Sequence, residues 1–264
     1  MKPLIIQTFL FFFIIQLLLI SGCSKEDSNP LVPDDSDKYF LMYFDNDSVK
    51  ISFSELPKFS INGEEAIQLN HFVDTTLVHP FIDKNDLSHD TRALYSYQIA
   101  GEDGFSAYTN RGYPNNIWGH LLLGHVIVSN RQVIFPADKI DLPGAYNVKT
   151  ARHIYIHRKF DLEFTDSVNI VELRNITPVQ VINQDGLPEQ AVPLKDVVMS
   201  QINNPGSYDY NIRSLDNFGP TTDMSWEQFQ TGYWLLSSEK TMFTDTTLVG
   251  GSYKLKVLDK ILLK

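Results

Sequence analysis

The chain has 264 residues, a formal net charge of −10, 43% hydrophobic residues and a single cysteine. The hydrophobic content is ordinary for a globular protein, so the chain can bury a core, and its length suits one large or two small domains. The negative charge opposes the phosphates of nucleic acid, and one cysteine cannot form a disulfide within the chain. We therefore expect no nucleic-acid partner and a fold that is stabilised by packing.

The first 22 residues have the features of a secretory signal. Lys2 supplies a positive start, the stretch from Leu4 to Ile20 is almost wholly apolar, and the small residues Ser21 and Gly22 close it. This order is typical of a signal peptide that is removed. The alternative is an N-terminal transmembrane anchor, since the apolar run is at the lower limit for spanning a hydrocarbon layer of ~30 Å.

The residues at the end of this signal favour lipid attachment. Ile20-Ser21-Gly22-Cys23 resembles the bacterial lipobox, in which an aliphatic residue and two small residues precede a cysteine. The resemblance implies a diacylglycerol on the Cys23 thiol and a further acyl chain, such as palmitate, on the new amino terminus. Two or more acyl chains anchor a protein stably, whereas one is marginal. We therefore predict Cys23 as a lipid attachment site and the membrane as a partner.

A charged segment follows the cysteine. Lys25-Glu26-Asp27 resembles the Lys-acid-acid signal that directs some Gram-negative lipoproteins outward. Residues 23–38 are polar, acidic and carry two prolines, which is typical of a tether. We expect a lipoprotein of the outer membrane that is exposed on the cell surface. The periplasmic face is the alternative.

The remaining sequence contains an internal repeat. Three pairs of residues share a separation of 108 positions: Trp118 and Trp226, Gly124 and Gly232, and Phe135 and Phe243. Other similar blocks keep the same order: 47–49 and 166–168, 65–73 and 190–198, and 95–105 and 208–218. We predict two tandem modules, residues 39–158 and 159–264. The alternative is a single irregular β-rich domain.

Strands dominate the pattern within each copy. Alternation with a period of two predicts strands at Val49–Phe53 and Tyr95–Ile99. Short helices are predicted after Leu69 and after Leu194, and Trp226–Leu236 indicates a further short helix or turn. The predicted class is therefore α+β and rich in β-strands.

The order of short motifs resembles a known family. The matching segments are Ile67-Gln68-Leu69, 100–105, Phe135-Pro136 and 144–149, and the second copy retains 192–194 and 251–256. Together they resemble the molybdopterin-binding fold of sulfite-oxidase-type oxidoreductases. The resemblance implies two sulfite-oxidase-like modules. Members of that family hold molybdenum through a cysteine thiolate, a soft ligand. Neither module contains a cysteine, so we expect no cofactor.

Other catalytic patterns are missing from the sequence. His120 and His125 lie five positions apart, and His153 and His157 lie four apart in a predicted strand. Neither spacing brings two ligands to one metal ion. The sequence contains no phosphate loop, dinucleotide fingerprint or nucleophile elbow. We predict no catalytic, cofactor-binding or metal-binding residues.

Three aromatic residues remain as candidate ligand contacts. Tyr108, Tyr113 and Trp234 stand near predicted loops and could contact a sugar or a peptide, since aromatic anchors dominate such contacts. Packing in the core is the alternative. We expect a membrane-anchored, non-catalytic binding or assembly module for an envelope protein or a glycan. The alternative function is a molybdopterin-type or other oxidoreductase with a site in the cleft between the modules.

Overall fold

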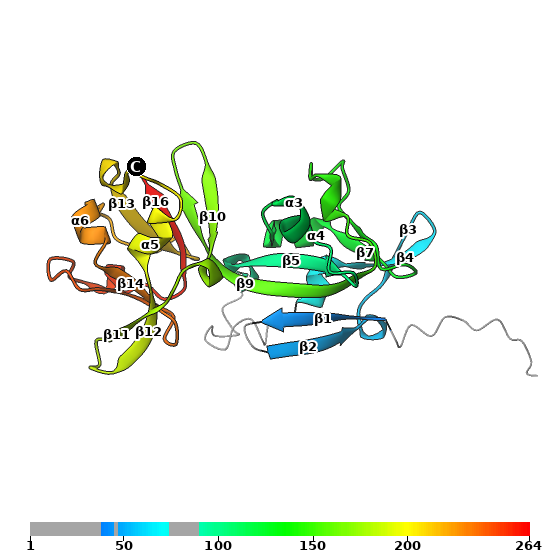
Figure 1. The fold of residues 1–264 in the computed structure, drawn as a ribbon, viewed down its shortest axis with the longest axis horizontal. Coiled ribbons are helices and arrows are strands. Elements are labelled where there is room, and N and C mark those ends of the chain that lie inside the picture. The colour runs from blue at the N-terminus through cyan, green and yellow to red at the C-terminus, as the bar shows by residue number, and fades with distance from the viewer. Residues whose placement is uncertain (1–37, 45–46, 74–89) are drawn as a thin grey trace, which may run out of the picture. The chain divides into compact units, whose positions relative to one another are not determined.

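The computed structural model describes residues 38–44, 47–73 and 90–264, and Ser36–Lys264 forms one compact unit. The described residues form three β-sheets with short helices (Figure 1). The chain is therefore rich in β-strands with a small helical part, which confirms the coarse class predicted from the sequence. The predicted signal, Cys23 and the tether up to residue 37 lie outside the described residues.

The largest sheet has eight strands and is built around β9. Its main order is β13–β16–β9–β1–β2, while β5 and β10 also pair with β9, and β6 pairs with β5. The strands are β1 (Tyr39–Phe44), β2 (Asp47–Ser52), β5 (Tyr95–Gly101), β6 (Asn116–Ile117), β9 (Ala151–Glu163), β10 (Val168–Glu172), β13 (Tyr210–Ser214) and β16 (Leu258–Leu263).

Two smaller sheets have four strands each. The first has the order β3–β4–β7–β8, with β3 (Phe59–Ile61), β4 (Glu64–Gln68), β7 (His125–Ile127) and β8 (Val133–Ile134). The second has the order β11–β12–β14–β15, with β11 (Val179–Ile182), β12 (Pro188–Pro193), β14 (Gly232–Leu235) and β15 (Lys240–Phe243).

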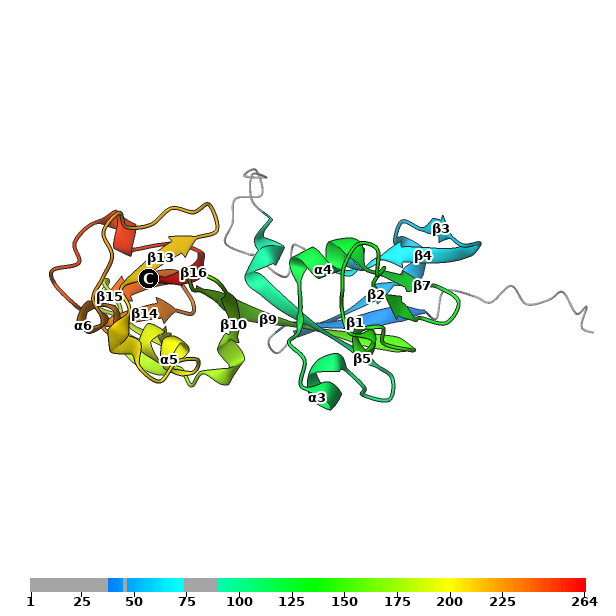
Figure 2. The same ribbon diagram turned by 90° about the horizontal axis from the view of Figure 1, so that it is seen from above.

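The α-helices of the described residues are short. They are α3 (Ala107–Arg111), α4 (Trp118–Leu123), α5 (Leu194–Met199) and α6 (Trp226–Phe229). Helix α4 lies beside β4 and the 3-10 turn Leu69–Phe72 (Figure 2). Helix α6 begins at a capping box, in which the Ser225 side chain accepts from the Gln228 backbone and the Gln228 side chain accepts in return. Helices of this length are stable only through such caps and tertiary packing.

Strand β9 belongs to both halves of the chain. Strand β1 pairs in parallel with His153–Ile156 of β9, and β16 pairs in parallel with Asp161–Glu163. Strands β5 and β10 pair with the same two ends of β9 in the antiparallel sense. The expected boundary between residues 158 and 159 therefore falls inside one continuous strand (Figure 1).

The strand order before β9 is repeated after it. The first half contains the hairpins β1–β2 and β3–β4, then β5, the hairpin β7–β8 and the closing strand β9. The second half contains β9–β10 and β11–β12, then β13, the hairpin β14–β15 and the closing strand β16. The last strand of each half lies parallel to its first strand. Strand β9 closes the first set and opens the second.

Equivalent glycines explain part of the repeated sequence. A Cβ atom built on Gly124 would lie 2.5 Å from Phe135 and 2.7 Å from Leu69. A Cβ atom on Gly232 would lie 2.6 Å from Phe243 and 2.9 Å from Leu194. In both halves a phenylalanine and a leucine close over a backbone that carries no side chain. The spacing of glycine and phenylalanine is thus fixed by the same packing contact.

The backbone turns also correspond. Arg131 and Glu239 both have positive φ, at 57° and 48°, each in the hairpin that leads into the last strand of its small sheet. Thr150 and Val257 both have positive φ, at 46° and 58°, just before the closing strands β9 and β16. Positive φ is unfavourable for a β-branched residue. The surrounding contacts therefore impose these turns on sequences that do not prefer them.

Each half buries its own apolar cluster. The first includes Phe40, Phe72 and Trp118, and the second includes Phe160 and Trp234. The buried apolar residues of β9 before residue 158 belong to the first cluster, and those after residue 158 belong to the second. The centre of β9 therefore lies where the two apolar clusters meet.

The local predictions agree with most of these elements. Strand β5 covers the predicted strand Tyr95–Ile99, and β2 covers the predicted strand Val49–Phe53 except for Phe53, which begins a 3-10 turn. The helix predicted after Leu194 is α5. The helix predicted after Leu69 is only a 3-10 turn, Leu69–Phe72. The segment Trp226–Leu236 divides into α6 and β14. The helix ends at Phe229, and the chain enters β14 at Gly232.

Candidate functional site: a cleft beside the shared strand

A cleft of about 560 Å³ opens beside the middle of β9. Its apolar lining comes from both halves of the chain and includes Phe44, Tyr95, Val192, Trp234 and Leu236. Its ionisable lining consists of His157, Arg158, Arg174 and Glu239. We call this feature the junction cleft. Its volume and its mixture of apolar walls with a few polar groups are typical of small-molecule sites.

Arg158 is held in place by main-chain carbonyl groups. Its Nη1 donates to the carbonyl oxygens of Leu94 at 3.0 Å and of Lys159 at 2.6 Å, and its Nη2 donates to that of Leu258. These acceptors come from both halves and are neutral. They fix the guanidinium group without adding a full negative charge.

Aromatic rings surround the same guanidinium. Its central carbon lies 5.1 Å from the ring centroid of Phe160, 5.4 Å from that of Trp234 and 5.8 Å from that of Tyr95. Such cation–π contacts stabilise a cation that has lost part of its hydration. Burial lowers the pKa of Arg158, while the negative charge of Glu239 acts to raise it. An arginine remains charged at neutral pH under these conditions.

Two buried nitrogen atoms of the cleft lining lack a hydrogen-bond partner among the described residues. They are Nε of Arg158 and Nε2 of His157. Burial and, to a smaller extent, the charge of Arg174 lower the pKa of His157 to about 4, against the opposite effect of Glu172. The imidazole is therefore neutral at pH 7. An unpartnered buried donor carries a free-energy cost that a ligand oxygen or a water could remove.

Glu172 joins the two halves at one edge of the cleft. It ends β10, is buried, and accepts from Ser96 Oγ at 2.5 Å, Asn115 Nδ2 at 2.6 Å and Arg174 Nε at 2.8 Å. The Arg174 guanidinium in turn lies 4.9 Å above the ring of Tyr108. A carboxylate with several donors is a satisfied buried charge. Glu172 and Tyr108 therefore hold the guanidinium group of Arg174, which also lines the cleft.

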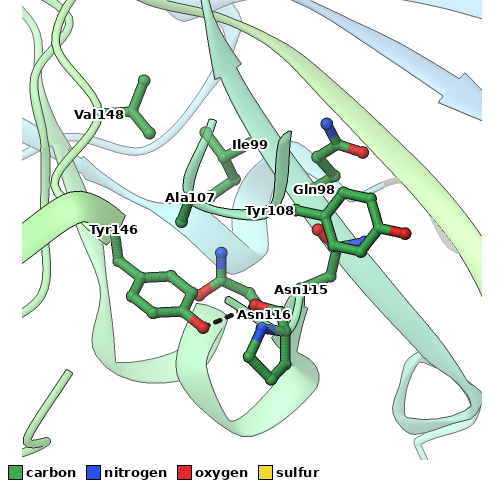
Figure 3. Close-up of a pocket in the computed structure, with 9 residues that line it drawn as sticks. Gln98, Ile99, Ala107, Tyr108, Asn115, Asn116, Tyr146 and Val148 are labelled. Carbon is green, nitrogen blue, oxygen red and sulfur yellow. Dashed lines mark hydrogen bonds between the residues drawn. The ribbon is translucent and has the colours of Figure 1, made fainter. Parts of the chain in front are cut away.

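A second, much smaller pocket lies beside α3. Figure 3 shows Gln98, Tyr108, Asn116 and Tyr146 around it. The Tyr146 hydroxyl donates to the carbonyl of Pro114 at 2.6 Å, which closes one side. The pocket has no room for a water molecule, so it cannot hold a ligand without a rearrangement.

A third pocket, of about 330 Å³, gathers two of the motifs that carry the family resemblance. Asp103 and Phe105 line it from the 100–105 segment, and Gly144, Asn147 and Lys149 line it from the 144–149 segment. The Asp103 carboxylate accepts from the Phe105 backbone at 3.0 Å and so stabilises its own turn. This pocket has a single aromatic residue and no arginine in its lining.

The three aromatic residues predicted as ligand contacts do not share one site. Trp234 lines the junction cleft, although it lies within β14 rather than near a loop and is only 1% exposed. Tyr108 is 37% exposed and reaches the cleft only through Arg174. Tyr113 is equally exposed and stacks on Tyr146, with ring centroids 5.9 Å apart, away from the cleft lining.

The charged residues of the cleft were not predicted from the sequence, although the position of Arg158 in β9 is unusual. Alternate positions of β9 share one face, and that face carries Ile154, Ile156, Phe160 and Leu162, all buried. Arg158 interrupts this inward series with a cation. A charge at an inward position indicates either a buried network or a binding site.

No cluster of three or more histidine, cysteine, aspartate or glutamate side chains suited to a metal ion occurs in the described part of the chain. Within the same residues, no helix is long and apolar enough to cross a membrane. Cys23 cannot be placed, because it precedes the first described residue. No protein-family model, curated protein or solved structure matches the chain.

Proposed function

We propose that this chain is a lipid-anchored, non-catalytic binding protein of the bacterial outer membrane, exposed on the cell surface, whose junction cleft receives the ligand. The cleft is the observation that carries the binding function. It combines about 560 Å³ of space with an apolar lining, of which Leu236 is the exposed part, and two guanidinium groups. Sites of this size bury most of a small ligand.

The anchor rests on the sequence alone. The proposed lipid attachment point is Cys23, after a signal that ends in Ile20-Ser21-Gly22. The acidic tether that follows would separate the folded body from the bilayer. Residues Lys25-Glu26-Asp27 support outward display. The ligand would then be a molecule or a partner group met at the envelope, such as part of a glycan or protein.

The two halves are proposed to be sulfite-oxidase-like modules. The support is the motif order together with the repeated strand order on both sides of β9. The donor set of the junction cleft does not fit the molybdenum ligation of that family. It contains two guanidinium groups, an imidazole and a carboxylate, but no thiolate. We therefore derive no redox step.

The anchor is tested by metabolic labelling with palmitate in a Gram-negative host. The wild-type chain should incorporate label and partition into detergent, and Cys23→Ser should do neither. Protease treatment of intact cells should degrade the wild-type protein. Label in the Cys23→Ser variant would contradict the lipid site, and full protection until lysis would contradict surface display.

The binding function is tested with the full-length chain purified in detergent. Wild-type protein is screened against envelope glycans and envelope protein extracts, beside Leu236→Arg and Leu122→Arg. Leu236 lines the cleft and is 38% exposed, whereas Leu122 is 41% exposed and lies outside it. The ligand should be retained by wild-type protein and Leu122→Arg and lost with Leu236→Arg. Equal retention by both variants would remove the cleft as the binding site, and stoichiometric molybdenum in the purified protein would contradict the non-catalytic assignment.

A further inference from the structure

Two guanidinium groups bring hydrogen-bond donors to the lining of the cleft. The N–H at Nε of Arg158 makes no hydrogen bond to the described residues, and its other recorded bonds end on neutral carbonyls. Arg174 uses its Nε for Glu172, which leaves its terminal N–H groups as further donors. Nε2 of His157 also lacks a partner, and it donates in one tautomer of the neutral imidazole and accepts in the other. A ligand that complements this arrangement must bring acceptor oxygen atoms.

The charges that line the cleft favour a negative acceptor over a neutral one. Arg158 and Arg174 contribute two positive charges, and Glu239 contributes one negative charge. Glu172 stands behind Arg174 and is already saturated by donors from Ser96, Asn115 and Arg174 itself. Hydrogen bonds from guanidinium groups to an oxyanion are about twice as strong as neutral ones. Low local polarity at the aromatic wall increases the effect.

The rest of the cleft favours an apolar ligand body. Trp234 lines the cleft with a side chain that is only 1% exposed, and its ring packs edge-on against Phe160, with centroids 5.6 Å apart and planes at 90°. Val192 and Leu236 line the cleft beside it. An apolar ligand group would bury its surface mainly against Leu236, which is 38% exposed.

We infer that the junction cleft binds an organic acid, in which a carboxylate or phosphate group accepts from Arg158 and Arg174 while an apolar body lies against Leu236, beside Trp234. This inference rests on the proposed binding function and adds the ligand class. Arg158 also supports the fold through its carbonyl contacts, so Arg174 is the better residue to vary.

The experiment uses isothermal titration calorimetry on the full-length chain in detergent, with three probes that share a phenyl group. They are 3-phenylpropionate, phenyl phosphate and the neutral 3-phenylpropionamide. At least one acid should bind about tenfold more tightly than the amide, since a charge-assisted hydrogen bond is lost in the amide. The two acids distinguish a carboxylate ligand from a phosphate ligand.

Arg174→Gln should reduce the preference for acid over amide to less than about threefold. Arg111→Gln, an exposed arginine of α3 outside the cleft, should keep the wild-type preference. Equal binding of acid and amide would overturn the inference but leave the cleft as a ligand site. An unchanged preference in Arg174→Gln would also overturn it. If no probe binds at millimolar concentration, the inference fails, whereas the cleft assignment is decided separately by the comparison of Leu236→Arg with Leu122→Arg.

Discussion

Tyr97 and Tyr210, in equivalent positions of β5 and β13, make the same hydrogen bond in the two halves of the chain. The Tyr97 hydroxyl donates to the carbonyl of Arg92 at 2.6 Å, and the Tyr210 hydroxyl donates to that of Pro205 at 2.5 Å. Each acceptor lies five residues upstream in a 3-10 turn. Burial raises the pKa of Tyr97 well above its usual value and that of Tyr210 to about 12. Both hydroxyls therefore stay protonated and remain donors at physiological pH.

The first prediction tests this equivalence. Tyr97→Phe and Tyr210→Phe should each lower the free energy of unfolding by about 1–2 kcal/mol, because each leaves a carbonyl without its donor. Urea denaturation followed by tryptophan fluorescence measures the change. Tyr113→Phe, at an exposed tyrosine, should change it by less than ~0.5 kcal/mol. A loss confined to one of the two buried tyrosines would show that the bonds are not equivalent.

The glycines of the two halves provide a second prediction. Gly124→Ala and Gly232→Ala should each cost about 1–3 kcal/mol in the free energy of unfolding, because the new methyl group would meet a phenylalanine and a leucine at less than 3 Å. Thermal unfolding measures the loss.

Gly119 is the matched control for these substitutions. It lies in α4, is exposed, and a Cβ atom there would meet nothing within 4 Å. Gly119→Ala should be neutral or stabilising by up to ~1 kcal/mol, since alanine is the better helix former. A stable Gly124→Ala protein would mean that Phe135 can move aside.

Much of the repeat could be predicted from the sequence because it depends on local packing rules. Trp118 and Trp226 begin equivalent helices, and Gly124 and Gly232 occupy equally crowded positions, so their spacing is visible in the sequence. Strand alternation around Tyr95–Ile99 was predictable for a similar reason. The shared use of β9 was not, because strand pairing links residues far apart in the chain and leaves no local pattern.

The candidate site was predictable only in part. An aromatic residue such as Trp234 could be selected, but the sequence does not say that it sits in a strand and shows only 1% of its surface. The junction cleft depends on where the second half folds back beside β9. Arg174 and Glu172 have no spacing that distinguishes them from surface charges. Their role follows from contacts with Ser96 and Asn115, which belong to the other half.

A third prediction concerns the link between the halves. Glu172→Gln should lower the free energy of unfolding by about 1–3 kcal/mol, because an amide cannot accept all the donors that now converge on the carboxylate. Urea denaturation again provides the measurement. Glu102→Gln removes the exposed ion pair with Arg131 and should cost only about 0–1 kcal/mol. Equal costs for the two variants would argue against Glu172 as the link.

The fourth prediction is a pH dependence that originates at His157. Its pKa is lowered from the ordinary value of 6.5 to about 4 in the folded chain, chiefly by burial. The unfolded chain therefore takes up a proton before the folded chain does as the pH falls. The contribution of neutral His157 to stability is fully present above pH 6.5 and is lost progressively between pH 6.5 and pH 4. The groups whose charges act on this imidazole are Arg174, which disfavours its protonation, and Glu172, which favours it.

His157→Gln removes this titration while keeping a polar side chain. Between pH 6.5 and pH 4, the unfolding free energy of the wild-type protein should fall by about 1–3 kcal/mol more than that of the variant. Urea denaturation at closely spaced pH values measures both curves, and the carboxylates that do not act on His157 contribute equally to each. Parallel curves would show that His157 is not held neutral by burial. A steeper fall in the unfolding free energy of the wild-type protein would locate a proton-sensitive group in the lining of the junction cleft. That group would lie close to Arg174, which we propose as a ligand contact.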